Sequence, residues 1–146
     1  MYADCRIYLS TVTAETKALL NSTITVFFAE NSSRNLGGGG GPRSMMVYEV
    51  QDMLCLSLDA VLDDDKRKLN GVFAEMANRE VFPIFKELGI NPEQPIRSQK
   101  PNPLPDRKAL DNVVFDILGL TQAERDEVYW AVCELVRNRL EKAKSV

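Results

Sequence analysis

The sequence contains no histidine, and its three cysteines, Cys5, Cys55 and Cys133, lie far apart with no CxxC spacing. Zinc sites of the usual kind are excluded, because they need closely spaced cysteine or histidine ligands. The lack of histidine also excludes Ser-His and Cys-His nucleophilic pairs. An odd, unpatterned set of cysteines is typical of a reducing compartment. We therefore expect a cytoplasmic protein that binds no metal and whose cysteines are small buried side chains.

Long hydrophobic runs and a surplus of positive charge are also missing. No apolar run approaches the roughly 20 residues of a membrane-spanning helix, and no basic region leads into an apolar stretch at the start, so neither a membrane partner nor a signal peptide is expected. The 18 Lys and Arg residues are outnumbered by 21 Asp and Glu residues, which leaves a net charge of −3. This charge disfavours a free-standing DNA-binding protein, because binding to phosphates needs a surplus of cations.

The remaining composition is that of one ordinary globular domain, with 146 residues of which 45% are apolar. Short alternating or apolar segments at residues 6–10, 45–48 and 54–58 predict a small sheet. Helical spacing from Thr13, a plausible N-cap, to about Glu30 predicts an amphipathic helix. The predicted fold class is therefore α+β, mostly helical, with a small sheet, a glycine-rich loop and a C-terminal helical hairpin.

The second half of the chain carries clear helix signals. Three aspartates from Asp63 predict a helix start, and Pro83 predicts a kink or break before the segment ends at Gly89. Residues 91–105 are rich in proline and predict an extended surface connection. A hairpin should follow, in which an apolar stripe over residues 110–118 packs on a last helix that begins with a capping box. The predicted partners on that helix are Val128, Val132 and Leu135. We expect two subdomains, residues 1–60 and 61–146.

Residues 37–41 are five successive glycines, and the run fits no known phosphate-binding motif. No Lys-Ser or Lys-Thr follows it, and Pro42 stands where a Rossmann helix would begin. Two interpretations remain open: a flexible surface loop, or a loop that lies close to a nucleic-acid backbone. Arg34 and Arg43 flank the run and favour the second interpretation.

Other candidate binding residues also have two interpretations. Arg97 and Lys100 lie in the proline-rich connection, where they either contact phosphate or are solvated charges. Tyr129 and Trp130 either belong to the core or stack on bases. No acid–base or nucleophilic constellation is recognisable, so we assign no catalytic residue.

Three stretches, taken in order, resemble one protein family. They are residues 20–25 (LNSTIT), residues 35–39 (NLGGG) with 47–50 (VYEV) and Leu54, and residues 110–121 (LDNVVFDILGLT) continuing to Leu140. They are similar to the late target-recognition region and the closing helical hairpin of type II restriction–modification DNA methyltransferases of the adenine-specific kind. The resemblance covers most of the chain.

The resemblance implies a role in DNA recognition without catalysis. In that family an earlier domain binds S-adenosylmethionine and positions a flipped adenine with an Asn-Pro-Pro-Tyr or Asp-Pro-Pro-Tyr motif. Neither tetrapeptide occurs here, so we expect no cofactor in this chain. We expect two partners, DNA and a catalytic methyltransferase domain or subunit. The predicted DNA-binding residues are Arg34, Asn35, Gly37, Gly38, Gly39, Arg43, Arg97 and Lys100.

The alternative function is a helical protein–protein interaction module, in which residues 106–145 dock on a partner subunit. The acidic composition favours this alternative, whereas the resemblance favours DNA recognition. Salt-dependent DNA binding would distinguish the two.

Overall fold

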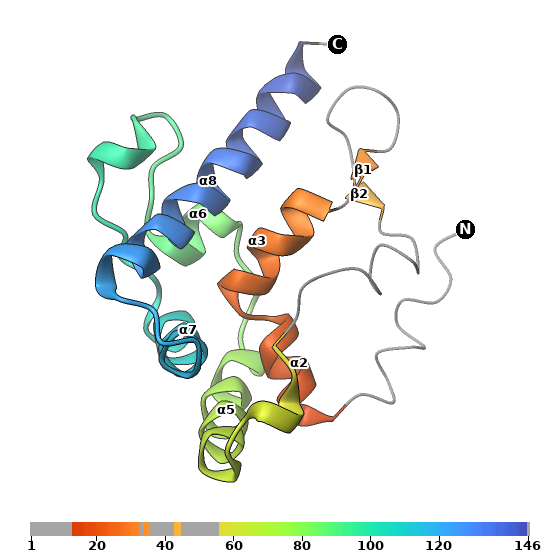
Figure 1. The fold of residues 1–146 in the computed structure, drawn as a ribbon. Helices are drawn as coiled ribbons and strands as arrows, with labels where there is room; N and C mark the ends of the chain where they lie inside the picture. Colours follow the sequence, from red (N-terminus) through yellow and green to blue (C-terminus); the bar gives the residue numbers. More distant parts are fainter. Residues whose placement is uncertain (1–12, 33, 36–42, 45–55, 146) are drawn as a thin grey trace.

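The computed structural model describes residues 13–32, 34–35, 43–44 and 56–145, and helices dominate this part of the chain (Figure 1). None of the described helices is both long and apolar enough to cross a membrane. The elements are, in order, α2 (Ala14–Leu20), α3 (Thr23–Ser32), β1 (Arg34–Asn35), β2 (Arg43–Ser44), the 3₁₀ helix η1 (Leu58–Ala60), α5 (Asp63–Ala77), α6 (Ile84–Leu88), the 3₁₀ helix η2 (Ile96–Ser98), α7 (Pro105–Ile117) and α8 (Gln122–Lys144).

The prediction of an α+β fold with a small sheet is wrong, because the described chain is helical. Extended pairing in it is limited to the two-residue antiparallel bridge β1–β2. Predicted strands 6–10 and 45–48 and the glycine run lie outside the described residues. In the third predicted strand, Leu58 begins η1, and the Val61 N–H donates to the Leu58 carbonyl at 3.2 Å. A short apolar run does not distinguish a strand from a helical turn, and Leu58, the last residue of this run, begins a 3₁₀ turn.

The helix starts follow their capping residues. The Thr13 hydroxyl accepts from the Thr16 N–H at 3.3 Å and begins α2. At the start of α8, Thr121 and Glu124 form the reciprocal capping box that the sequence predicts. The first predicted helix is divided into α2 and α3, because the Ser22 hydroxyl donates to the Leu19 carbonyl at 2.7 Å and ends the first segment.

The break predicted around Pro83 is confirmed. Helix α5 ends at Ala77, α6 begins after Pro83, and Gly89 ends α6 in the left-handed region with φ 63°. The Asn102 N–H donates to the Leu88 carbonyl at 3.0 Å, so the following connection folds back onto α6. This connection is not simply a surface segment, since Ile96 is buried in the core.

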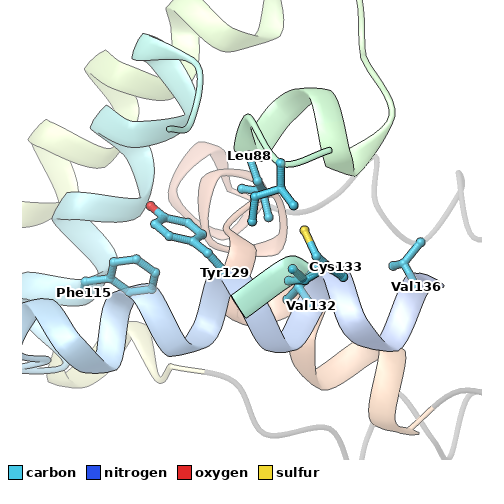
Figure 2. Close-up of a cluster of buried hydrophobic side chains, with 8 residues drawn as sticks. Leu88, Phe115, Tyr129, Val132, Cys133 and Val136 are labelled. Atoms are coloured by element: carbon cyan, nitrogen blue, oxygen red, sulfur yellow. The ribbon is translucent and has the colours of Figure 1, made fainter. Parts of the chain in front are cut away.

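Two hydrophobic clusters form the core. The first joins α6, the connection, α7 and α8 (Figure 2), and contains Leu88, Ile90, Ile96, Phe115, Tyr129, Val132, Cys133 and Val136. The second joins α2, α5 and α7, and contains Ala18, Leu19, Leu69, Leu110 and Val114. Partly buried side chains of α3 pack against both clusters, including Ile24.

Helices α7 and α8 pack mainly on other helices and only locally on each other. Helix α7 lies chiefly along α5, and α8 lies chiefly along α3. Phe115 and Val132 share the first cluster, as predicted, but Leu110 and Val114 pack on α2 and α5 instead. The two helices form where they were predicted and are joined at Gly119, but the prediction that the whole 110–118 stripe packs on α8 is corrected. Both clusters contain residues from before and from after position 60. The division of the chain into two subdomains at this position stays a prediction.

Candidate nucleic-acid interface

A buried carboxylate connects two stretches that lie far apart in the sequence. Asp111 on α7 is fully buried, and its oxygens accept from the Thr23 N–H at 2.8 Å and the Thr23 hydroxyl at 2.7 Å. Burial raises the pKa of Asp111 to about 6, although the Thr23 hydrogen bonds and the nearby Arg107 charge oppose the shift. Burial also raises the pKa of the neighbouring Tyr129 hydroxyl above its ordinary value.

An ionic cluster lies next to this carboxylate. Glu87 on α6 is 2% exposed and accepts two hydrogen bonds from the Arg79 guanidinium, at 2.8 and 2.7 Å. Arg107 on α7, also buried, donates to Glu87 at 3.3 Å and to the Asn21 carbonyl between α2 and α3. Asp106 binds the other side of Arg79.

These contacts satisfy the buried charges of the cluster. Burial alone would raise the pKa of Glu87, but hydrogen bonds from Arg79 and the Phe82 N–H, with the Arg107 charge, hold that pKa below its ordinary value. The cluster therefore connects α5, α6, α7 and the α2–α3 junction, and we interpret it as a scaffold rather than a reactive centre.

Three of the predicted recognition residues, Arg34, Asn35 and Arg43, lie in the strand pair that follows α3. Backbone pairing places Asn35 opposite Arg43 and Arg34 opposite Ser44. Gly37, Gly38 and Gly39 lie outside the described residues. Just before the strand pair, the Glu30 carboxylate binds the Arg139 guanidinium of α8 at 3.3 Å. This ion pair joins the end of α3 to α8.

The other two predicted binding residues, Arg97 and Lys100, lie on η2 and just after it, and Arg97 contacts α8. The Arg97 guanidinium on η2 donates to Glu127 at 2.8 and 2.7 Å and to Glu134 at 2.9 and 3.1 Å. Two carboxylates around one guanidinium leave this spot net negative, and a phosphate would have to displace them. Lys100 is exposed two residues after η2 ends.

The adjacent aromatic residues are engaged inside the protein. Tyr129 is buried against Phe115, with ring centroids 5.6 Å apart in an edge-to-face arrangement. The Trp130 ring N–H donates to the Gln99 carbonyl at 2.8 Å and holds the proline-rich connection on α8. The core interpretation of Tyr129 is therefore confirmed, and its ring is not accessible for base stacking.

The described residues also provide an apolar hollow of about 470 Å³ between α2, α3, η1 and α7. Its lining includes Leu20, Phe28, Leu56 and Leu118. Within the same part of the chain, no group of three or more His, Cys, Asp or Glu side chains is placed to hold a metal ion. Burial raises the pKa of the Cys133 thiol to about 12, which keeps the thiol protonated and unreactive at neutral pH.

Sequence reasoning missed the buried polar residues of this scaffold. Arg107 and Asp111 lie four residues apart on the same side of α7 as Leu110 and Val114, which are fully buried. Charged residues inside an apolar stripe were the available signal, since buried charges require partners. The identity of those partners, Glu87 and Thr23, could not be predicted from that signal.

Comparison with known protein families, curated proteins and solved structures finds no match for this chain. The likeness to DNA methyltransferases therefore depends on the three sequence stretches alone.

Proposed function

We propose that this chain is the DNA-recognition and closing portion of a restriction–modification DNA methyltransferase of the adenine-specific kind, and that it carries no methyl-transfer chemistry itself. The observation that supports the proposal is the contact between Thr23 and Asp111. These residues belong to the first and third stretches of the resemblance, and they meet in the core at 2.8 and 2.7 Å. Stretches that belong to one structural unit are expected to meet in its core, as these two do.

In this proposal the helices are a scaffold, and the segment between β1 and β2 contacts DNA. Glycines let a backbone approach a phosphate closely, and arginines at its two ends neutralise phosphate or reach base edges. Arg34, Asn35 and Arg43 are thus the principal binding positions, together with Gly37, Gly38 and Gly39. The two carboxylates that hold Arg97 make that residue a poor phosphate ligand.

The proposed partners are duplex DNA and a methyltransferase catalytic domain, in the same polypeptide or as a separate subunit. That domain would supply the S-adenosylmethionine site. Because the chain has a net charge of −3, we expect it to bind DNA weakly on its own. In the proposed arrangement, the catalytic domain contributes the further phosphate contacts.

The test is fluorescence anisotropy of a labelled DNA duplex titrated with the whole chain at several salt concentrations, starting at low ionic strength. The variant Arg34→Ala/Arg43→Ala should bind more weakly, and its salt dependence should fall by about two phosphate contacts' worth. Lys17→Ala/Lys108→Ala is the matched control, since it removes two exposed cations from α2 and α7. Absence of DNA binding by the parent chain, or equal slopes for the parent and the arginine variant, would contradict the proposal.

A second candidate function is docking on another protein. The face formed by Arg97, Glu127 and Glu134 favours it, because one cation and two carboxylates suit a basic protein surface better than DNA. The same titration distinguishes the two candidates, since a protein-docking module would show no salt-dependent binding to duplex DNA.

A further inference from the structure

The described helices form two groups that pack mainly within themselves. Helix α5 packs on α2 and α7, whereas α8 packs on α3, α6 and η2, and we call these sets the α5 group and the α8 group. In Figure 1, α2, α5 and α7 lie in the lower part of the molecule, and α3, α6 and α8 lie above them. Each group is built around one hydrophobic cluster, and Ile24 and Phe115 connect the two clusters.

The boundary between the two groups, which we call the seam, carries polar contacts from α7 to the α8 group. They are Asp111 to Thr23 at 2.8 and 2.7 Å, Arg107 to Glu87 at 3.3 Å and Asp116 to Arg125 at 2.6 Å. Interdigitated apolar side chains have one close-packed arrangement, whereas water can replace a polar contact at small cost. The seam is therefore the boundary along which the groups separate most easily.

Short connections beside the seam are suited to act as pivots. Asn21 and Ser22 lie between α2 and α3, and the Arg107 guanidinium donates to the Asn21 carbonyl. Gly119 lies between α7 and α8 with φ 68°, and a Cβ atom there would meet no neighbour within 4 Å. Hinges in proteins are a few residues at the ends of helices that absorb a change of backbone angles. Both connections can bend without disturbing either cluster.

The apolar hollow of about 470 Å³ lies on the same boundary. Leu20 and Leu118 of the α5 group line it together with Ile24 and Phe28 of α3. Close-packed helix interfaces contain no space of this size. Helix α3 therefore has room to shift relative to α2 and α7.

Asp111 makes the charge of the seam depend on pH. It is fully buried, and burial raises the pKa of its carboxyl to about 6. Thr23 of α3, Tyr129 of α8 and Arg107 of α7 face it, and Arg107 is paired with Glu87 of α6. The pKa of Glu87 is lowered and that of Tyr129 is raised, so neither group changes charge near pH 6. Burial penalises the ionised carboxylate, and water that enters the seam would stabilise it.

We propose that the α5 and α8 groups are the two bodies of a hinge, which is closed when Asp111 is protonated and opens along the seam when Asp111 is ionised. In the open state, water reaches the carboxylate between α3 and α7, and the contact with Thr23 is lost. The folded pKa of about 6 lies above the ordinary value of 3.8, so the closed packing binds the proton more tightly than an exposed carboxylate does. The closed state is therefore favoured below pH 6 and loses this advantage as the pH rises.

The experiment measures distances between nitroxide labels in the whole chain by double electron–electron resonance. Arg67→Cys on α5 and Glu141→Cys on α8 place one label on each group at exposed positions. Cys5 and Cys55 are replaced by Ser in every variant, and the buried Cys133 stays unlabelled. One distance population is expected at about pH 5, and a second population should grow towards about pH 8 with its midpoint near 6.

Three controls isolate the hinge and its titrating group. Labels at Arg67→Cys and Lys108→Cys both lie in the α5 group, where α5 packs on α7, so their distance should not change with pH. In the pair that spans the seam, Asp111→Asn stays neutral and should keep the single population throughout. Asp59→Asn removes an exposed carboxylate from η1 and should behave like the parent.

Hydrogen exchange of the unlabelled parent gives a second readout that requires no substitution at the seam. After correction for intrinsic rates, the Thr23 amide should lose protection above pH 6, while the Val132 amide within α8 keeps it. A single population at all pH values with constant Thr23 protection would refute the hinge. So would the same pH response in Asp111→Asn, or a parallel change within the α5 group. None of these measurements involves DNA, so their failure would leave the proposed function standing.

Discussion

Single residues in the core of this protein carry charges that are normally found at the surface. Asp111, Arg107 and Glu87 are all buried, and each is held by specific partners. An unpartnered charge at any of these places would cost several kcal/mol, so the network must form completely as the helices come together. The same buried groups make the stability of the protein depend on pH.

The first prediction concerns the pH dependence from Asp111. Its folded pKa of about 6 lies above the ordinary value of 3.8, so its contribution to stability is fully present below about pH 4 and is lost as the pH rises through 6. Relative to Asp111→Asn, the parent should lose roughly 2–3 kcal/mol of unfolding free energy between about pH 4 and pH 7. Denaturant unfolding of both proteins over this range measures the difference.

The control is Asp116→Asn, which removes an exposed carboxylate from the same helix. Glu87 and Asp106 have lowered pKa values, so their contributions are lost as the pH falls, but they are common to parent and variant and cancel in the difference. Parallel pH profiles for the parent and Asp111→Asn would show that Asp111 does not titrate as described.

The second prediction compares two glycines. Gly89 has φ 63°, and a Cβ atom there would overlap the Asn102 carbonyl, so Gly89→Ala should destabilise the protein by about 2 kcal/mol or more. Gly71 lies within α5, and a Cβ atom there would meet no neighbour within 4 Å. Gly71→Ala should therefore stabilise the protein by about 0.5–1 kcal/mol. Denaturant midpoints that shift in the same direction for both variants would contradict this account.

At the scale of elements, neighbours in the sequence are not the main neighbours in space. Helix α8 lies along α3, and α7 lies along α5, although α7 and α8 are joined by a short turn at Gly119. Both ends of α3 are held by long-range contacts, Thr23 to Asp111 and Glu30 to Arg139. Helix α3 therefore connects the polar core to the strand pair as one supported element.

The third prediction tests the packing of α8. Val132 is fully buried in the cluster with Leu88 and Phe115 (Figure 2), so Val132→Asp would bury an unpaired charge and should cost roughly 3–5 kcal/mol. Leu140→Asp is the control, because Leu140 is 42% exposed and its replacement should cost about 1 kcal/mol or less. An unchanged melting temperature for Val132→Asp would refute the described packing.

At the scale of the whole molecule, the described surface divides by charge. The face around Arg97, Glu127 and Glu134 is net acidic, whereas the last turn of α8 carries Lys142 and Lys144, which form no ion pair within the described residues. A net charge of −3 therefore does not exclude a local site for an anion.

The fourth prediction is that the isolated chain neither binds S-adenosylmethionine nor methylates DNA. The chain lacks the catalytic tetrapeptide of the family that it resembles and a recognisable cofactor loop. Isothermal titration calorimetry with S-adenosylmethionine should give no binding heat, and methyl transfer to DNA should stay at background. Micromolar binding of the cofactor would overturn this prediction.

Local signals in the sequence predicted the helices well. Caps at Thr13 and Thr121, the aspartates from Asp63 and the break at Pro83 each act within a few residues, so each could be recognised without knowledge of the fold. The sheet was mispredicted because a short apolar run is compatible with a strand or with a helical turn, such as the one that begins at Leu58, and the local sequence does not choose between them. The recognition residues around the glycine run stay a prediction.

The sequence by itself determined where most of the helices begin and end, because capping and backbone preferences act over a single turn. Only the tertiary structure decided which helices pair, that Arg107 and Asp111 face partners 20 and 88 residues away, and that Arg97 is held by two carboxylates. The physical reason is that burial, ion pairing and pKa shifts depend on distances through space. Those distances are set by the packing of α3 on α8 and of α5 on α7.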